Sequence, residues 1–297
     1  MGSSIHGSDT EHRRSRDKGE LARALAALTK NPLSITAVML LGVMALVAVF
    51  APALATHPPN QVVLQDRLLP PSRVHLFGTD DLGRDMFSRV LYGARISLRI
   101  ALVVVGTAVA LGTALGAVAG YSGGWVDELI MRCSEIFLAF PPLILAMAIA
   151  ASLGASIANV MLALTIVWWP QYCRIIRGSV LVLRETDFVT AARALGASNG
   201  RIILRHILPN CFAPALVQGS LDLGRVLLTA ATLSFLGFGA RPPAPEWGAM
   251  ISLGRSFIRD HWWYATFPGL AMLVTVLAFN LFGDAVRDML DPRLRHR

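Results

Sequence analysis

The chain has little charge and almost no lysine. Charged residues make up only 15% of its 297 residues, whereas a soluble domain usually has about a quarter. Its basic residues are nearly all arginine, because Lys18 and Lys30 are the only lysines. A phosphate-binding loop requires Gly-Lys-Ser/Thr, and neither lysine stands in that context. The chain therefore cannot supply a standard ATPase site.

Common catalytic and metal-binding motifs are also missing. The sequence contains no His-Glu-x-x-His, no Gly-x-Ser-x-Gly and no paired intramembrane aspartates. Its cysteines, Cys133, Cys173 and Cys211, show no metal-ligand spacing, and we interpret them as small packing residues. Basic residues do not alternate with aromatics as in a nucleic-acid-binding module. The sequence thus predicts no catalytic residue, no metal site and no nucleic-acid partner.

What the chain has in abundance is long apolar runs. Hydrophobic residues make up 54% of it, and runs long enough to cross a bilayer predict an all-α integral membrane protein with about six transmembrane helices. A cleaved signal peptide is an alternative for the first run, but that run is about twice the usual length of a signal core. The predicted spans are residues 34–55, 97–120, 136–154, 157–176, 212–239 and 265–285.

The remaining segments give the domain organisation. Residues 1–33 and 287–297 are polar tails, the first with a short amphipathic helix near Leu21–Leu28, and residues 56–96 form a Pro-rich polar segment. The core at 97–286 contains the long polar loop 177–210. One side of the membrane, with both tails and this loop, holds roughly twice as many Lys and Arg residues as the other. The positive-inside rule then places both termini in the cytoplasm and residues 56–96 outside.

The loop 177–210 predicts a short helix near Glu185–Asn199. Thr186 or Asp187 can cap its start, and Gly196 can end it in the left-handed conformation. A narrow apolar face recurs at helical spacing. Such a helix can dock in a groove of a soluble partner or lie against lipid headgroups, and the residues alone favour neither. The apolar face consists of Phe188, Ala191, Ala192 and Leu195.

Three smaller patterns suggest local roles. Gly112, Gly116 and Gly120 leave a smooth groove for another helix, and we favour packing within the chain over a contact between subunits. Asp222 and Arg225, spaced i,i+3 in a span, can line a pathway, but we favour a position in water or at a subunit contact. An outer acidic segment lacks the alternation of a calcium loop, so we expect local capping and contact with an extracytoplasmic partner. Its residues are Asp80, Asp81, Arg84 and Asp85.

The loop resembles the permease subunits of ATP-binding-cassette (ABC) importers. Ala191-Ala192, Gly196 and Leu208-Pro209 fall in register with the family's Glu-Ala-Ala…Gly…Leu-Pro signature, although Thr190 replaces the Glu. Further segments resemble the dipeptide/oligopeptide/nickel branch, and the resemblance covers roughly residues 30–297. These segments are residues 77–85, 88–95, 242–248 and 279–292.

The resemblance implies a type I ABC importer permease (MetI-like) fold in a bacterial inner membrane. It implies a homologous second permease, two cytoplasmic ATPase subunits that bind ATP and Mg²⁺, and an extracytoplasmic binding protein. The ATPases would contact the loop at Glu185–Gly196 and Leu208-Pro209. This chain itself would bind no cofactor and would not be an enzyme alone.

The substrate and two other functional classes stay open at this point. Dipeptides or oligopeptides are the expected cargo, with nickel, glutathione, opines or another small solute as alternatives; the spans lack the His or Met cluster that nickel would favour. An ion-coupled secondary transporter would need intramembrane carboxylates, of which Asp222 is thin support. An intramembrane enzyme is disfavoured by the missing nucleophile and metal motifs.

Overall fold

The computed structural model describes residues 32–290, and these residues form helices without a named strand. The tails outside this range, including the helix predicted at Leu21–Leu28, lie beyond the described residues. The long helices are α2 (Pro32–Leu54), α3 (Met86–Ser122), α4 (Gly124–Leu138), α5 (Pro142–Leu153), α6 (Ile157–Leu183), α9 (Leu208–Phe235) and α11 (Trp263–Leu290). The short elements are η1 (Leu64–Asp66), α7 (Asp187–Ala194), α8 (Asn199–Ile202), η2 (Ile203–Ile207), α10 (Trp247–Gly254) and η3 (Arg255–Phe257).

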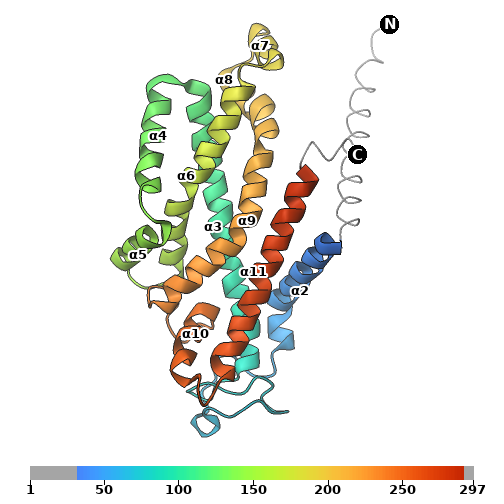
Figure 1. The fold of residues 1–297 in the computed structure, drawn as a ribbon, viewed down its shortest axis with the longest axis vertical. Helices are drawn as coiled ribbons and strands as arrows, with labels where there is room; N and C mark the ends of the chain where they lie inside the picture. Colours follow the sequence, from blue (N-terminus) through green and yellow to red (C-terminus); the bar gives the residue numbers. More distant parts are fainter. Residues whose placement is uncertain (1–31, 291–297) are drawn as a thin grey trace.

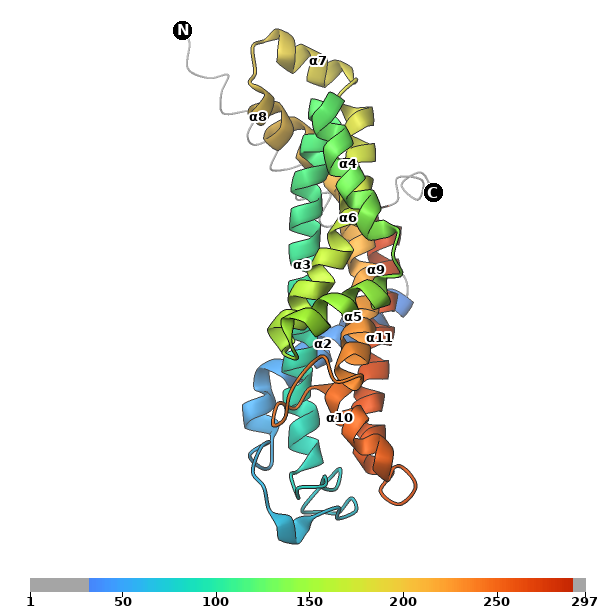
Figure 2. The same ribbon diagram turned by 90° about the vertical axis from the view of Figure 1, so that its left-hand side faces the viewer.

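The helices form an elongated bundle with two distinct ends. Helices α3, α6, α9 and α11 run along its length, with α2 beside α11 and α4 beside α6 (Figure 1). The short helix α7 lies at one end, whereas the segment between α2 and α3 and helix α10 lie at the opposite end (Figures 1 and 2). The loop 177–210 and the segment 56–85 are therefore separated by the whole length of the bundle.

The apolar helices agree with a membrane protein but differ in detail from the predicted spans. Four described helices, α2, α3, the continuous α8–α9 rod and α11, are long and apolar enough to cross a membrane. The predicted span 136–154 is instead the pair α4 and α5, bent by 92° at a short break. Pro141 and Pro142 explain the break, because proline disfavours helix in the residue before it. Helix α6 has 27 residues but is not among these four, and polar residues such as Asn159, Gln171 and Arg174 interrupt its apolar run.

Helix α2 has the character of a lipid-facing span. Only 11% of its most apolar window is buried in the protein. Large apolar side chains along it are exposed, including Met39, Leu46 and Val49. A hydrocarbon environment is the solvent in which such a surface is stable.

The three spaced glycines lie where α3 packs on α6. A Cβ atom on Gly112 would lie 2.5 Å from the Tyr172 Cβ and 2.6 Å from the Trp169 carbonyl oxygen. A Cβ on Gly120 would lie 2.9 Å from the Val180 Cβ. The glycines therefore permit close packing inside this chain, which is the reading that the sequence favoured.

We expect Gly112→Ala to destabilise the purified protein by about 1–3 kcal/mol, because neither the Tyr172 Cβ nor the backbone oxygen can move away cheaply. The matched control is Gly106→Ala on the same helix, where a Cβ meets nothing within 4 Å. Thermal unfolding in detergent, followed by tryptophan fluorescence, measures both. Equal unfolding temperatures for the two variants would contradict the close packing of α3 on α6 at Gly112.

Candidate functional site

The loop between α6 and α9 contains the predicted short helix. Helix α7 spans Asp187–Ala194 with Thr186 at its N-cap position. Gly196 has a φ of 79°, the left-handed conformation that glycine adopts without steric cost. The chain reverses there through the hydrogen bond from the Ala197 N–H to the Ala192 carbonyl, of 3.1 Å. The helix therefore has defined ends on both sides.

Helix α7 presents apolar side chains outward while one residue anchors it. Val189 is fully buried and belongs to a cluster with Ile202, Ile207 and residues of α3, α6 and α9. Phe188 is 43% exposed and Leu195 is 88% exposed. Ala191 between them is also exposed, and Ala192 is half-buried. We call Phe188, Ala191 and Leu195 the α7 face.

Several polar contacts join this loop to the bundle. Arg184 donates from Nη1 to the Gly120 carbonyl at the end of α3, at 2.9 Å, and from Nε to Glu185, also at 2.9 Å. Tyr121 donates from its hydroxyl to Asn199 Oδ1 at 2.9 Å. The loop that carries α7 is thus held to the end of α3 at two points, one on either side of α7.

The first turn of α4 is joined to α6 by a bidentate ion pair. Arg177 donates from Nε and Nη2 to the two carboxylate oxygens of Asp127, at 2.5 and 2.6 Å. This fork geometry is the strongest form of the arginine–carboxylate contact.

Leu208 and Pro209 of the predicted signature are the first two residues of α9. Leu208 is half-buried and Pro209 is exposed.

Asp222 in α9 is buried rather than in water, which corrects the interpretation favoured from the sequence. Its carboxylate accepts from the Tyr172 hydroxyl at 2.8 Å and from Gln218 Nε2 at 3.1 Å. Arg225 Nη1 lies 3.6 Å from Asp222 Oδ1, but its side chain is 67% exposed. The i,i+3 spacing indicated the Arg225 contact, whereas Tyr172 lies on another helix and left no local signal.

At the opposite end the predicted local capping is present, whereas the predicted partner contact does not fit three of the four residues. Asp80, Arg84 and Asp85 are buried, and they pair within the chain. Arg84 donates from Nε to Asp80 at 2.6 Å, and Asp85 caps α3 by accepting from the Ser88 N–H at 2.8 Å. Asp81 remains partly exposed and accepts from the Tyr264 hydroxyl at 2.7 Å.

Arg89 is a central residue of this buried network that sequence reasoning missed. Its side chain is 2% exposed, and Nε lies 3.5 Å from Asp80 Oδ2. Nη1 donates to the Pro59 carbonyl at 2.9 Å, to Asn60 Oδ1 at 3.2 Å and to the Pro243 carbonyl at 3.3 Å. One guanidinium therefore joins the start of α3 to two segments far from it in sequence.

Two of the three tryptophans at this end are buried in the chain. Trp247 and Trp263 are buried, and their indole N–H groups donate to the carbonyls of Val90 and Thr79 at 3.0 and 3.1 Å. Trp262 is 50% exposed, as an interface anchor would be.

Glu246 caps α10 by accepting from the backbone N–H groups of Gly248 and Ala249. Burial raises the pKa of this carboxyl, while the two N–H donors oppose the shift.

A family model described as the binding-protein-dependent transport system inner membrane component matches residues 112–296. The chain belongs to this family. A second model, the N-terminal transmembrane domain of oligopeptide transport permease C, matches residues 20–71. The chain is therefore a multi-pass permease of an ABC importer in the inner membrane, as the resemblance predicted.

Curated relatives cover nearly the whole chain. The probable D,D-dipeptide transport system permease protein DdpC of Escherichia coli is 49% identical over 92% of this chain and 91% of its own length. The dipeptide transport system permease protein DppC of Alkalihalophilus pseudofirmus is 47% identical over 92% of this chain and 90% of its own.

Solved structures confirm the predicted fold class. An inward-facing structure of the MetNI methionine ABC transporter aligns with a TM-score of 0.54 and 18% identity, over 69% of this chain and 98% of the solved chain. An amino acid ABC transporter crystallised with histidines aligns with a TM-score of 0.50 and 17% identity. At these identities the likeness concerns the fold.

Proposed function

We propose that this chain is the peptide-conducting permease subunit of an ATP-driven importer and that partner ATPases act on it through α7. The observation that carries the proposal is the α7 face, which is exposed and apolar while Val189 fixes the helix to the bundle. An apolar helix face docked in a groove is a common mode of protein recognition. ATP and Mg²⁺ bind to the two ATPase subunits, since this chain has no nucleotide motif.

A second, homologous permease completes the path as a heterodimer partner. An apolar groove of about 800 Å³ runs along α3, α9 and α11. A span of the second permease fits such a surface, because apolar side chains and small residues support helix packing in lipid. The groove is lined by Val109, Thr113, Phe212, Leu216, Leu223 and Phe282, among others.

In the orientation that the positive-inside rule predicts, the α7 end and both termini lie in the cytoplasm. The opposite end, with the segment 56–85 and α10, then faces an extracytoplasmic binding protein that delivers the substrate. In the cycle, ATP binding closes the two ATPases and moves α7. The contacts of Arg184 with α3 and of Val189 with the bundle pass this motion to the spans, and the path opens outward.

Dipeptides or oligopeptides are the proposed cargo. The names of the two relatives described above concern D,D-dipeptide and dipeptide transport. Nickel, glutathione, opines or another small solute remain the alternatives, since the binding protein selects the substrate that reaches the permease.

Co-purification in a gentle detergent tests the proposed assembly. We expect an amino-terminally tagged chain to bring down a second hydrophobic permease and ATPases with Walker motifs, identified by mass spectrometry. A stable chain that purifies alone would contradict the assembly and favour an ion-coupled transporter, in which Asp222 would be the intramembrane carboxylate.

A further inference from the structure

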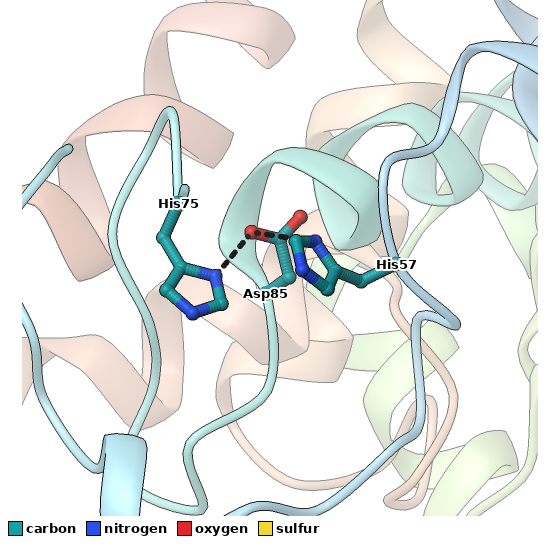
Figure 3. A group of neighbouring side chains, drawn as sticks. All are labelled: His57, His75 and Asp85. Atoms are coloured by element: carbon teal, nitrogen blue, oxygen red, sulfur yellow. Dashed lines mark hydrogen bonds and ion pairs between the residues drawn. The ribbon is translucent and has the colours of Figure 1, made fainter. Parts of the chain in front are cut away.

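Three side chains from separate segments meet at the end of the bundle opposite α7. His57 follows α2, His75 lies in the loop before α3, and Asp85 caps α3. Their nitrogen and oxygen ligand atoms all lie within 4.8 Å of one another. Figure 3 shows the two imidazole rings on either side of the Asp85 carboxylate. We propose that His57, His75 and Asp85 form a site for a divalent transition-metal ion, Zn²⁺ in the first place.

The distances suit a small tetrahedral ion. Asp85 Oδ1 lies 3.0 Å from His75 Nδ1 and 3.8 Å from His57 Nδ1. Ligand atoms at a tetrahedral Zn²⁺ are about 3.4 Å apart, given metal–ligand bonds of about 2.0–2.1 Å. The ligand atoms of His57 and His75 lie within 4.8 Å of each other, so the two rings must approach by about an ångström for all three atoms to reach bonding distance. The fourth position is left for water.

The neighbouring groups hold the ligands in place. Asp85 Oδ2 accepts from the Ser88 N–H at 2.8 Å and from the Thr56 hydroxyl at 3.4 Å, which leaves Oδ1 to the imidazoles. The second ring nitrogen of His75, Nε2, lies 3.9 Å from Asp66 Oδ2. This distance is longer than a hydrogen bond, and a closer approach would give the carboxylate–imidazole pair that usually orients a ligating ring.

The donor set selects the class of metal. Two imidazole nitrogens and one carboxylate oxygen suit Zn²⁺ and its neighbours, whereas Ca²⁺ and Mg²⁺ prefer sites made of oxygen atoms. The side chains of Asp85 and His75 are 1% and 9% exposed, and that of His57 is 35% exposed, so an ion enters past His57. Sequence reasoning missed the site because its residues have no motif spacing.

A bound ion would join three segments. It would tie the end of α2 and the loop at His75 to the cap of α3, in addition to the hydrogen bond from the His57 N–H to the Ser88 hydroxyl at 3.1 Å. The ion would therefore crosslink the segment 56–85 to the start of α3. This inference is independent of the proposed transport function, because it concerns binding and stability alone.

The test uses the full chain without a histidine tag, purified in detergent, treated with EDTA and freed of the chelator. Titration with Zn²⁺ should give one tight site per chain and a higher unfolding temperature. Co²⁺ should give the visible absorption of a tetrahedral centre. His57→Ala should lower the affinity at least tenfold and remove the Co²⁺ spectrum.

His206→Ala is the matched control, because His206 is equally half-buried but lies at the other end of the bundle. It should bind Zn²⁺ as the original chain does. Since His57 is partly exposed, its replacement should leave the fold intact, which the unfolding temperature of the metal-free protein checks. Stoichiometric binding that survives His57→Ala, or no binding by the original chain, would overturn the proposal and leave a hydrogen-bonded His–Asp pair.

Discussion

Replacing Phe188 and Leu195 together by glutamate should reduce ATP-driven uptake about tenfold or more. Both side chains are exposed on the α7 face, so the change leaves the core intact. Two charges in an apolar docking groove carry a desolvation cost that the interface cannot offset. In most interfaces a few residues near the centre carry much of the binding energy, at about 2 kcal/mol or more for each of them.

The measurement compares uptake and co-purifying ATPase for the original chain and the F188E/L195E variant. The control is Val182→Glu, which places a charge at a 72% exposed apolar position on the last turn of α6, outside the α7 face. The control should retain ATPase binding and uptake, and all three chains should unfold at similar temperatures. Normal uptake by F188E/L195E would show that the coupling surface lies elsewhere.

Arg89→Met should destabilise the protein by about 2–4 kcal/mol, because it removes a buried hydrogen-bonded cation and leaves Arg84 as the remaining partner of Asp80. Methionine keeps most of the side-chain volume but removes the guanidinium beside Asp80. It also removes the hydrogen-bond donor to the carbonyls of Pro59 and Pro243. We expect the unfolding temperature in detergent to fall on the order of 10 °C.

Arg95→Met is the control for this substitution. Arg95 lies on the same helix but is exposed, and its guanidinium carbon lies 5.9 Å from the Tyr92 ring. Its replacement should change stability by no more than about 0.5 kcal/mol. If Arg89→Met unfolds at the temperature of Arg95→Met, the buried network does not hold the start of α3.

The sequence predicted those features that depend on local pattern. Hydropathy located α2 and α11 to within a few residues, and helical spacing with a terminal glycine predicted α7. The predicted start of α3 was eleven residues too late, about three turns of helix, because residues 86–96 are amphipathic and were interpreted as loop. Their helix is stabilised by Asp85 at the N-cap and by burial of Arg89, which hydropathy does not record.

Contacts between distant segments could not be predicted in the same way. The sequence predicted both local capping and a partner contact for the outer charged segment, because acidic side chains are mostly exposed. Asp80, Arg84 and Arg89 instead pair with one another, so each makes the burial of the others tolerable. Likewise, Tyr172 meets Asp222 and His57 meets Asp85 only after the helices pack, and neither pair has a signal in sequence spacing.

The energy source of transport is the most direct test of the central claim. The measurement is uptake of a radiolabelled dipeptide into proteoliposomes that contain the purified complex. The binding protein is added outside the vesicles, and ATP is enclosed inside, on the side of the ATPases. The account predicts uptake that requires ATP and persists when an ionophore collapses the ion gradients. Uptake that runs without ATP and stops with the ionophore would contradict it and would make this chain an ion-coupled transporter.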